Sequence, residues 1–597
     1  MGELKYLNKY LFKYRYRLIL GIVFVIISNY FGVIPAKIIR RAFDLVNENI
    51  TLYKLFSGFN SQDTIYSIFG KTMLIFGLSV LLTAILRGVF LFFMRQTIIV
   101  VSRLIEYDLK NEIYNHYQQL SLSFYRRNNT GDLMNRITED VSRVRMYLGP
   151  AIMYTINTLV LFLLVIVTMA NINLKLTLFS LLPLPVMAVV IYYVNSIIHH
   201  KSEHIQEQLS NLSSFTQETF SGVRVLKAYV REEKIREDFE AQSEAYKKRS
   251  MSLARVQAFF YPTVLLLVGM SVVLTVYIGG IEVKNGNITP GNIAEFIVYI
   301  NQLTFPMMSL GWVTSLIQRA AASQKRINEF LNTKPEITSS TENASEIKGD
   351  LEFRNVSFTY PDTGIQALKN VSFNAKAGEF IAFIGRTGSG KSTIANLIAR
   401  MYDVNSGEIL IDNKNIKAYD LNNLRENMGF VPQEVFLFSD TITNNIAFGL
   451  NKVDKEQVYE AARKAAVYNN IQAFPDGFET TIGERGITLS GGQKQRVSIA
   501  RAIIKEPQIM VFDDCLSAVD TKTEEEILSN LGQVMHNKTS IIISHRVSSI
   551  KNADKIFVID EGMIIESGNH ETLIAQKGEY FELYEKQLLE EEEVLDN

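Results

Sequence analysis

The stretch Phe380–Thr393 reads FIAFIGRTGSGKST and decides the fold of the C-terminal half of the chain. An apolar segment leads into a glycine-rich loop and then into Lys391 and Ser392, the order of a strand, a phosphate-binding loop and a helix. Glycines let backbone N–H groups wrap phosphate oxygens, and the helix N-terminus adds a favourable dipole. We expect Lys391 to reach the β- and γ-phosphates of a nucleotide and the Ser392 hydroxyl to bind Mg²⁺.

Two more apolar segments downstream end in polar residues. The first, Gln508–Phe512, is followed by Asp513 and Asp514, and the second, Ser540–Ser544, is followed by His545. We expect Asp513 to hold Mg²⁺ through water and Asp514 to align the attacking water as a base. His545 is placed to contact the γ-phosphate. Short apolar strands alternating with helices predict an α/β domain with a largely parallel sheet.

Between these segments lies Leu489–Gln493, LSGGQ, whose small residues open a predicted helix. The backbone N–H groups at such a helix start can form a second cradle for an anion.

The N-terminal half contains six apolar stretches long enough to cross a bilayer, which takes about 20 residues. They are Leu18–Ala36, Met73–Met94, Ala151–Ala170, Leu176–Val194, Val256–Ile278 and Ile293–Val313. The second stretch contains Arg87, which should face protein or water or, as we expect, extend to the cytoplasmic interface. The sixth contains Glu295, which could bind a cation but which we expect to be solvated near a helix end. Before the first stretch, Lys5–Arg17 predicts an interfacial helix.

Basic residues predict the orientation of these spans. The loop between the second and third spans and the loop between the fourth and fifth are rich in Lys and Arg; they carry Arg103, Lys110, Arg126, Arg127, Arg136, Arg143 and Arg145, and Lys227, Arg231, Lys234 and Arg236 respectively. By the positive-inside rule both loops, the N-terminus and the C-terminal half are cytoplasmic. We expect the spans to continue as long helices, with a short crossing helix in Phe124–Asp140 and another in Phe215–Lys234.

The composition narrows the function classes. The net charge of −1 disfavours a general nucleic-acid binder, and the single cysteine, Cys515, excludes an intrachain disulfide. We predict a transmembrane domain at 1–330, a linker at 331–349, a nucleotide-binding domain at 350–585 and an acidic tail at 586–597.

Together these motifs, in this order and spacing, resemble the ABC transporter family, and the resemblance covers nearly the whole chain. It implies an all-α six-helix transmembrane domain followed by an α/β P-loop ABC-type ATPase domain, as in half-size exporters. Catalytic roles are implied for Asp514, His545 and Gln433, and Mg²⁺ binding for Ser392, Gln433 and Asp513. ATP binding is implied for Tyr360, which matches the adenine-stacking aromatic, and for Gly385, Arg386, Thr387, Gly388, Ser389, Gly390, Lys391, Ser392, Thr393, Ser490, Gly491, Gly492, Gln493 and Asp520. Gly483–Gly486 matches the loop before the signature, and Ser517–Asp520 the D-loop.

In that family two chains pair and sandwich two ATP molecules between the phosphate loop of one chain and the LSGGQ signature of the other. The resemblance therefore implies a translocase that couples ATP hydrolysis to export across the bacterial cell membrane. Spans rich in Phe, Tyr, Leu and Met suit a hydrophobic or amphipathic cargo, drug-like or lipid. The alternatives are a lipid flippase and an ATP-gated channel or regulator.

One residue departs from the family pattern: Asp514 stands where glutamate is usual. Its carboxylate is drawn back by about 1–1.5 Å, and a misplacement of roughly 1 Å can cost about a hundredfold in rate. The substitution resembles the weak site of bacterial heterodimeric multidrug exporters, which favours a heterodimer in which this chain hydrolyses ATP slowly at its own site. The alternative is a homodimer with Asp514 as a working base, and the retained His545 favours that alternative.

Overall fold

The computed structural model describes residues 2–55, 58, 61–339, 346–483, 489–516 and 521–595. The chain forms two compact units: Met1–Tyr117 with Gly131–Thr333, and Gln118–Thr130 with Lys334–Asn597. The short segment Gln118–Thr130 therefore belongs with the C-terminal half, although both of its ends continue into the helical first unit.

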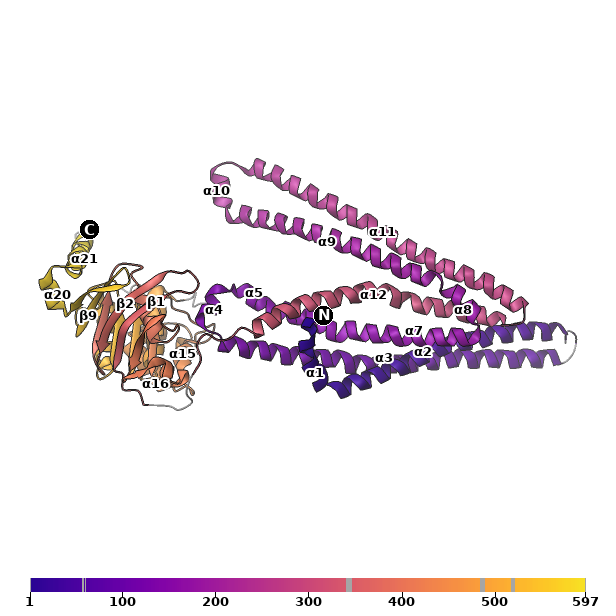
Figure 1. Cartoon of the computed structure of the whole chain (residues 1–597), viewed down its shortest axis with the longest axis horizontal. Helices are drawn as coiled ribbons and strands as arrows, with labels where there is room; N and C mark the ends of the chain where they lie inside the picture. Colours follow the sequence, from indigo (N-terminus) through magenta and orange to yellow (C-terminus); the bar gives the residue numbers. More distant parts are fainter. Residues whose placement is uncertain are drawn as a thin grey trace. The chain divides into compact units, whose positions relative to one another are not determined.

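Long helices make up the first unit (Figure 1). The six long enough and apolar enough to cross a membrane lie, among the described residues, within Arg15–Leu52, Asp63–Gln119, Thr130–Ile172, Leu174–Ser221, Glu232–Lys284 and Pro290–Leu331. The prediction of six spans is thus confirmed. The helices are η1 (Gly2–Leu7), α1 (Asn8–Lys13), α2 (Arg15–Leu55), α3 (Ser61–Gln119), α5 (Thr130–Asn135), η2 (Arg136–Asp140), α6 (Val141–Met146), η3 (Tyr147–Ala151), α7 (Ile152–Ile172), α8 (Leu174–Leu181), α9 (Pro183–Ser221), α10 (Val223–Ala228), α11 (Glu232–Lys284) and α12 (Pro290–Leu331).

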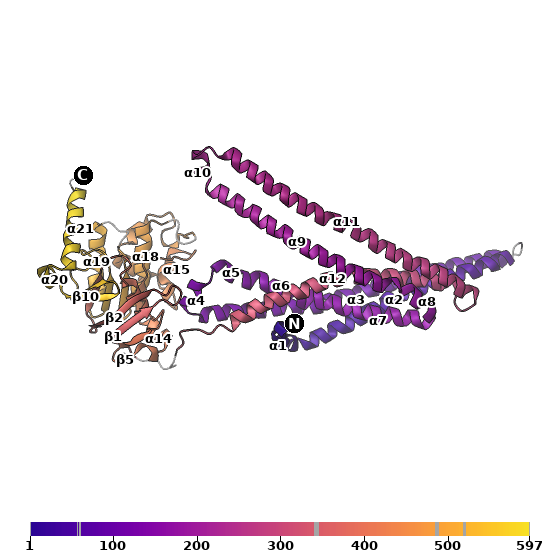
Figure 2. The same cartoon turned by 45° about the horizontal axis from the view of Figure 1, so that its top comes forward.

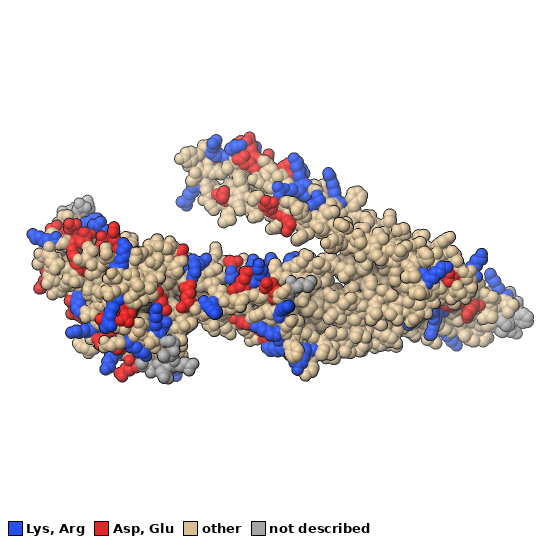
Figure 3. Space-filling model, in the orientation of Figure 1, with Lys and Arg blue, Asp and Glu red and all other residues tan. Residues whose placement is uncertain are grey.

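The spans continue as helices well beyond their apolar stretches. In Figures 1 and 2, α9 and α11 run side by side and are joined at one end by the short helix α10. A second short helix, α4 (Leu122–Arg127), follows α3. Short helices therefore lie in both loops in which we expected them. Figure 3 shows that the long helices share a stretch of surface with very few Lys, Arg, Asp or Glu side chains. A surface that faces lipid needs to be apolar in this way.

The spans differ in how much of their apolar surface is buried by other helices. In α3, 6% of the most apolar 18-residue segment is buried inside the protein, and in α12 the corresponding share is 39%. The buried face of α12 carries Phe296, Tyr299, Ile300 and Leu303, which pack with apolar residues of α2, α7, α9 and α11. Helix α12 is therefore the centre of this unit, and α3 presents most of its apolar surface outward.

The expectation that Glu295 is solvated is wrong. Its side chain is 0% exposed and accepts hydrogen bonds from the Tyr299 hydroxyl at 2.8 Å and the Asn292 amide at 3.3 Å. Arg40 of α2 lies 3.5 Å from the same carboxylate. A buried carboxylate needs such partners, because the cost of desolvation is otherwise prohibitive. In the second span the Arg87 guanidinium lies against Gly32 of α2, where a Cβ would be 3.3 Å away.

The second unit is built on two sheets. The six-stranded sheet has the order β10 (Met563–Gly568), β9 (Lys555–Asp560), β3 (Phe380–Ile384), β8 (Thr539–Ile543), β7 (Ile509–Asp513) and β6 (Met428–Val431). Its strands from β9 to β6 are parallel, and β10 is antiparallel. The four-stranded antiparallel sheet has the order β2 (Gln366–Ala375), β1 (Leu351–Thr359), β4 (Ser406–Ile411) and β5 (Lys414–Asn415).

Helices cover the larger sheet, and side-chain alternation along its strands separates two cores. In β3, Ile381 and Phe383 join one apolar cluster, and Ala382 and Ile384 join the other. The helices of this unit besides α4 are α13 (Lys391–Ile398), η4 (Ile416–Ala418), α14 (Leu421–Glu426), α15 (Ile442–Ile446), η5 (Ala447–Gly449), α16 (Lys455–Lys464), α17 (Tyr468–Gln472), η6 (Gly477–Glu479), α18 (Gly491–Ile503), α19 (Thr521–Met535), α20 (His570–Gln576) and α21 (Glu579–Leu595). The predicted acidic tail is helical as far as Leu595.

Candidate nucleotide-binding site

The glycine-rich loop lies between β3 and α13, as the sequence predicts. Gly390, which precedes the first residue of α13, has φ +106°, and a Cβ there would lie 2.4 Å from the carbonyl oxygen of Ala367. Both the conformation and the close approach require glycine. Because β3, β8 and β7 are neighbouring parallel strands, the residues after them meet at the same edge of the sheet as this loop.

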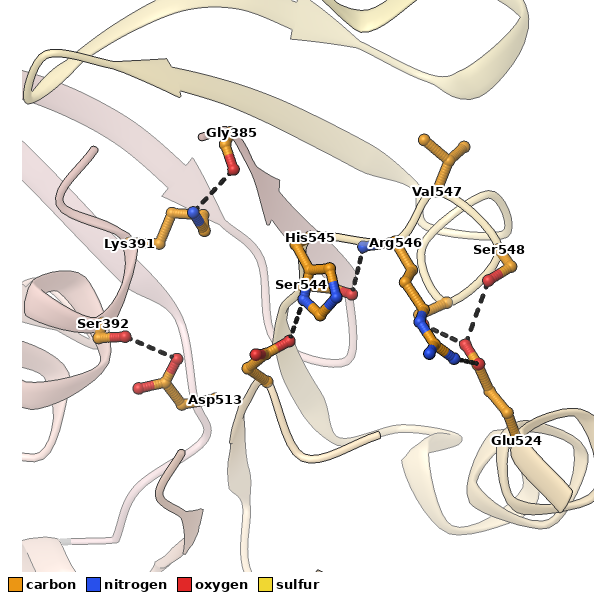
Figure 4. A network of polar contacts seen from close by, with 12 residues as sticks. Gly385, Lys391, Ser392, Asp513, Glu524, Ser544, His545, Arg546, Val547 and Ser548 are labelled. Carbon is orange, nitrogen blue, oxygen red and sulfur yellow. Dashed lines mark hydrogen bonds and ion pairs between the residues drawn. The ribbon is translucent and has the colours of Figure 1, made fainter. Parts of the chain in front are cut away.

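Lys391 lies over the loop. Its ammonium donates a hydrogen bond to the carbonyl oxygen of Gly385 at 2.8 Å (Figure 4). It also donates to the carbonyl oxygen of Arg386 at 2.7 Å. Burial lowers the pKa of Lys391, and the charges of Asp514 and Asp513 oppose that shift. A cation held over the glycine-rich loop by two of its carbonyl oxygens is placed to bind a polyphosphate.

Ser392 and Asp513 form the centre of the site. The Ser392 hydroxyl donates to the Asp513 carboxylate at 3.0 Å (Figure 4), and the Asp513 residue is 3% exposed. Burial raises the pKa of Asp513 to about 6; Asp514 adds to the shift, and Ser392 and Lys391 oppose it. A hydroxyl and a carboxylate oxygen are ligands that Mg²⁺ accepts together with phosphate oxygens and water. These two side chains therefore fit the cation that the sequence implies.

Asp514 and His545 are paired. The Asp514 carboxylate lies 2.7 Å from Nδ1 of His545, and the Asp514 backbone N–H donates to the Ile543 carbonyl oxygen at 2.8 Å. Asp514 also has φ +49°, a conformation that side chains with a Cβ adopt rarely. The end of β7 thus turns so that the carboxylate faces the imidazole that follows β8. The neighbouring Cys515 is buried, which raises the pKa of its thiol, so it is a packing residue.

The part of the cavity that contains Tyr360, the residue expected to stack on adenine, also contains an arginine that the sequence analysis did not assign there. The Arg126 guanidinium of α4 lies 5.2 Å from the ring centroid of Tyr360 and 5.9 Å from that of Tyr402. The Tyr360 hydroxyl is 3.0 Å from the Thr393 hydroxyl. The same helix is held by an ion pair between Arg127 and Glu336. In the sequence Arg126 is one of many loop arginines, and nothing in its neighbours marks it as a nucleotide-site residue.

A cavity of about 750 Å³ joins most of the predicted residues. Its lining includes Arg126, Tyr360, Thr387, Gly388, Gly390, Lys391, Ser392, Thr393, Gln433, Asp513, Asp514 and His545. Gly385, Arg386 and Ser389 belong to the same loop, and Arg386 forms an ion pair with Glu579 at 2.7 Å.

The signature residues lie elsewhere. Ser490 caps α18, accepting from the Gln493 N–H at 3.3 Å, while the Gln493 side chain accepts from the Ser490 N–H at 3.0 Å. Among the residues that the structure describes, the cavity lining does not include Ser490, Gly491, Gly492 or Gln493. Asp520 with the rest of the predicted D-loop, and Glu484–Gly486, lie outside the described residues.

Comparison with known proteins agrees with this geometry. Residues 18–307 match the ABC transporter transmembrane region, and residues 368–517 match the ABC transporter domain. The multidrug resistance-like ATP-binding protein MdlA of Escherichia coli is 38% identical over 81% of this chain and 82% of its own length. The chain belongs to the ABC transporter family.

Two further relatives extend the comparison. The ATP-dependent lipid A-core flippase of Haemophilus influenzae is 35% identical to the transporter over 84% of this chain and 86% of its own. The solved structure of a bacterial Atm1-family ABC exporter with ATP bound superposes with a TM-score of 0.75 at 27% identity, covering 96% of this chain and 98% of the other. The transporter is thus a multi-pass membrane ATPase of the exporter type.

The raised pKa of Asp513 predicts that Mg²⁺-dependent nucleotide binding is sensitive to mild acid. A carboxyl group with a pKa near 6 is protonated below that pH, and it must lose the proton to help bind the cation. We expect the Mg²⁺-dependent part of the affinity for a fluorescent ATP analogue to fall by up to about tenfold for each pH unit below 6.

The measurement is a titration of the full transporter in detergent, with Mg²⁺ or with EDTA. Asp513→Asn should remove the Mg²⁺-dependent part at every pH, whereas Asp476→Asn, on the exposed surface of the same unit, should leave it unchanged. An equal loss of affinity in EDTA would contradict the assignment to Asp513.

Proposed function

We propose that the transporter exports apolar or amphipathic compounds across the cell membrane by alternating access driven by ATP. The observation that carries the proposal is the cavity that gathers Lys391, Ser392, Asp513 and Asp514 in the same chain as six apolar helices. The printed names of the relatives, a multidrug resistance-like protein and a lipid A-core flippase, support both cargo classes.

The surface of the spans suits such a cargo. Each of the six helices has an apolar window with at most two charged residues, and large apolar side chains such as Tyr192, Tyr193, Phe259 and Tyr261 are exposed on α9 and α11. Walls of this kind bind ligands through apolar area rather than through a fixed charge. The basic loops favour an orientation in which the N-terminus and the ATPase domain are cytoplasmic.

Two chains complete the ATP sites. The N-terminus of α18 offers N–H groups to an anion, yet its signature residues are not among the described residues that line the cavity of their own chain. A second chain that presents its signature to this cavity, and receives the signature of this chain, accounts for both features. ATP would then favour the closed pair, since it binds that state better than the open one.

Asp514 favours a pair of two different chains whose ATP sites differ in activity. Its carboxylate is one methylene shorter than that of glutamate, and it already contacts His545 at 2.7 Å, which holds it close to β8. We infer that this chain hydrolyses ATP slowly at its own site and supplies an intact LSGGQ to the faster site of a different half-transporter. The contact with His545 also supports the homodimer alternative, because a base oriented by histidine can be functional without further reach.

The transport proposal is tested in inside-out vesicles that contain the transporter. We expect ATP-dependent uptake of an amphipathic dye or a labelled lipid, and loss of uptake with Lys391→Ala. Uptake of lipid but not of dye would indicate a flippase. Cargo that neither moves nor changes ATPase activity, together with ATP-dependent ion conductance, would contradict export and favour a channel.

Asp514→Glu tests the reach of the base. If the short carboxylate limits the rate, restoring the methylene should raise ATPase activity at this site, by up to about a hundredfold. The measurement is the single-site turnover of the purified pair, with Asp513→Glu as a matched control that lengthens the neighbouring carboxylate and should lower activity. An unchanged or lower rate in Asp514→Glu would contradict a reach-limited site.

Gentle purification of the tagged transporter from its native membranes tests the pairing. We expect a second half-transporter to co-purify, with glutamate after its Walker B aspartate and an altered signature. Recovery of this chain alone, with ATPase activity, would establish the homodimer and make Asp514 an adequate base.

A further inference from the structure

Three of the seven histidines of the transporter lie within six consecutive positions, at His199, His200 and His204. All three are on α9, beyond Val194 at the end of the predicted fourth apolar stretch. Their side chains are 68%, 74% and 53% exposed. None of them lines the nucleotide cavity, so the ATPase does not account for this cluster.

His200 and His204 face each other across one turn of α9. Residues four positions apart lie on the same helix face, and here the two Nε2 atoms are 3.3 Å apart. A Zn²⁺ ion binds imidazole nitrogen at about 2.0–2.1 Å, and two such nitrogens at a tetrahedral angle are roughly 3.3 Å apart. The separation of the two nitrogens therefore matches that of two ligands on one metal ion, while the rings themselves are edge to face with centroids 4.6 Å apart.

The other nitrogen of each ring faces a carboxylate. Nδ1 of His204 lies 3.5 Å from the Glu207 carboxylate, and Nδ1 of His200 lies 3.9 Å from that of Glu203. Histidines that bind metals commonly donate this second N–H to a carboxylate, which fixes the tautomer and makes the free nitrogen a better ligand. The carboxylates here are close to the Nδ1 atoms but not hydrogen-bonded to them. With protons on both Nδ1 atoms, both Nε2 atoms would carry a lone pair, and the two nitrogens are 3.3 Å apart, so a shared metal ion could bind both.

The neighbouring helix holds the cluster in place. Arg249 of α11 donates to the backbone carbonyl oxygen of His204 at 2.8 Å and lies 3.7 Å from Glu207. The third histidine, His199, is near Glu203: its Nε2 atom lies 3.6 Å from the Glu203 carboxylate. Glu203 and Glu207 therefore place negative charge beside the histidines, and the cations nearby are Arg249, which is near Glu207, and Lys201, which donates to Ser252 at 2.6 Å.

We propose that His200 and His204 bind one divalent transition-metal ion, with Cu²⁺ preferred over Zn²⁺ and Ni²⁺ by the usual order of affinities. The described residues contain no group of three or more His, Cys, Asp or Glu placed to hold a metal. The ion therefore has two protein ligands and keeps its remaining positions for water or for a donor group from outside this chain.

The probe is Cu²⁺, added to the full transporter purified through a tag without histidine. We expect an electron paramagnetic resonance spectrum with coupling to two equivalent nitrogens and about one tightly bound ion per chain. His200→Ala and His204→Ala should each remove the two-nitrogen signal and weaken binding by at least about tenfold. Mg²⁺-dependent ATPase activity measured without Cu²⁺ should stay unchanged in both variants, which shows that they are folded.

Matched controls separate a built site from scattered surface histidines. His199→Ala, next to the pair, and His536→Ala, exposed in the other unit, should keep the two-nitrogen signal. Glu207→Gln should keep the signal but weaken the affinity up to about tenfold, as loss of an outer carboxylate does. A signal that survives His204→Ala, or that is lost equally in His199→Ala, would overturn the proposal.

Discussion

The alignment of three parallel strands is the constraint on which the ATPase site depends. Strand β8 pairs with β3 on one side and with β7 on the other, with Ile543 beside Phe383 and beside Asp513. The residues that follow these strands therefore leave the sheet at one edge. Without this register, the 3.0 Å contact between Ser392 and Asp513 could not form, because the two residues are separated by more than a hundred positions.

The same alignment explains the electrostatics. Asp513 lies at the end of a buried strand, and the burial of its carboxylate raises its pKa. Ser392 and Lys391 lie near enough to oppose this shift. The site therefore contains a partly desolvated carboxylate, Asp513, and a partly desolvated ammonium, Lys391, close to each other. We expect a ligand that carries both negative phosphates and a divalent cation to offset these charges, with the phosphates beside Lys391 and the cation beside Asp513.

Much of this arrangement was predictable because its causes are local. A strand, a glycine loop and a helix in sequence predict the phosphate cradle, and acidic or histidine residues after apolar strands predict a common edge. The exceptions depend on long-range packing. Arg126 reaches Tyr360 because α4 folds with the C-terminal half, and the buried Glu295 has Arg40 of α2 as a partner in addition to Asn292 and Tyr299 of its own helix. The position of a side chain in its own helix cannot reveal either partner.

The pairing of Asp514 with His545 bears on how far the short Asp514 carboxylate can reach. At 2.7 Å the imidazole holds the short carboxylate beside the end of β8, and the backbone is already in the left-handed region at Asp514. Reaching further would require either breaking this contact or changing a backbone angle that the Ile543 hydrogen bond helps to fix. A longer side chain could keep the histidine contact and still extend toward a water molecule. On the proposal that Asp514 acts as the base, side-chain length rather than flexibility would therefore set how far its carboxylate reaches.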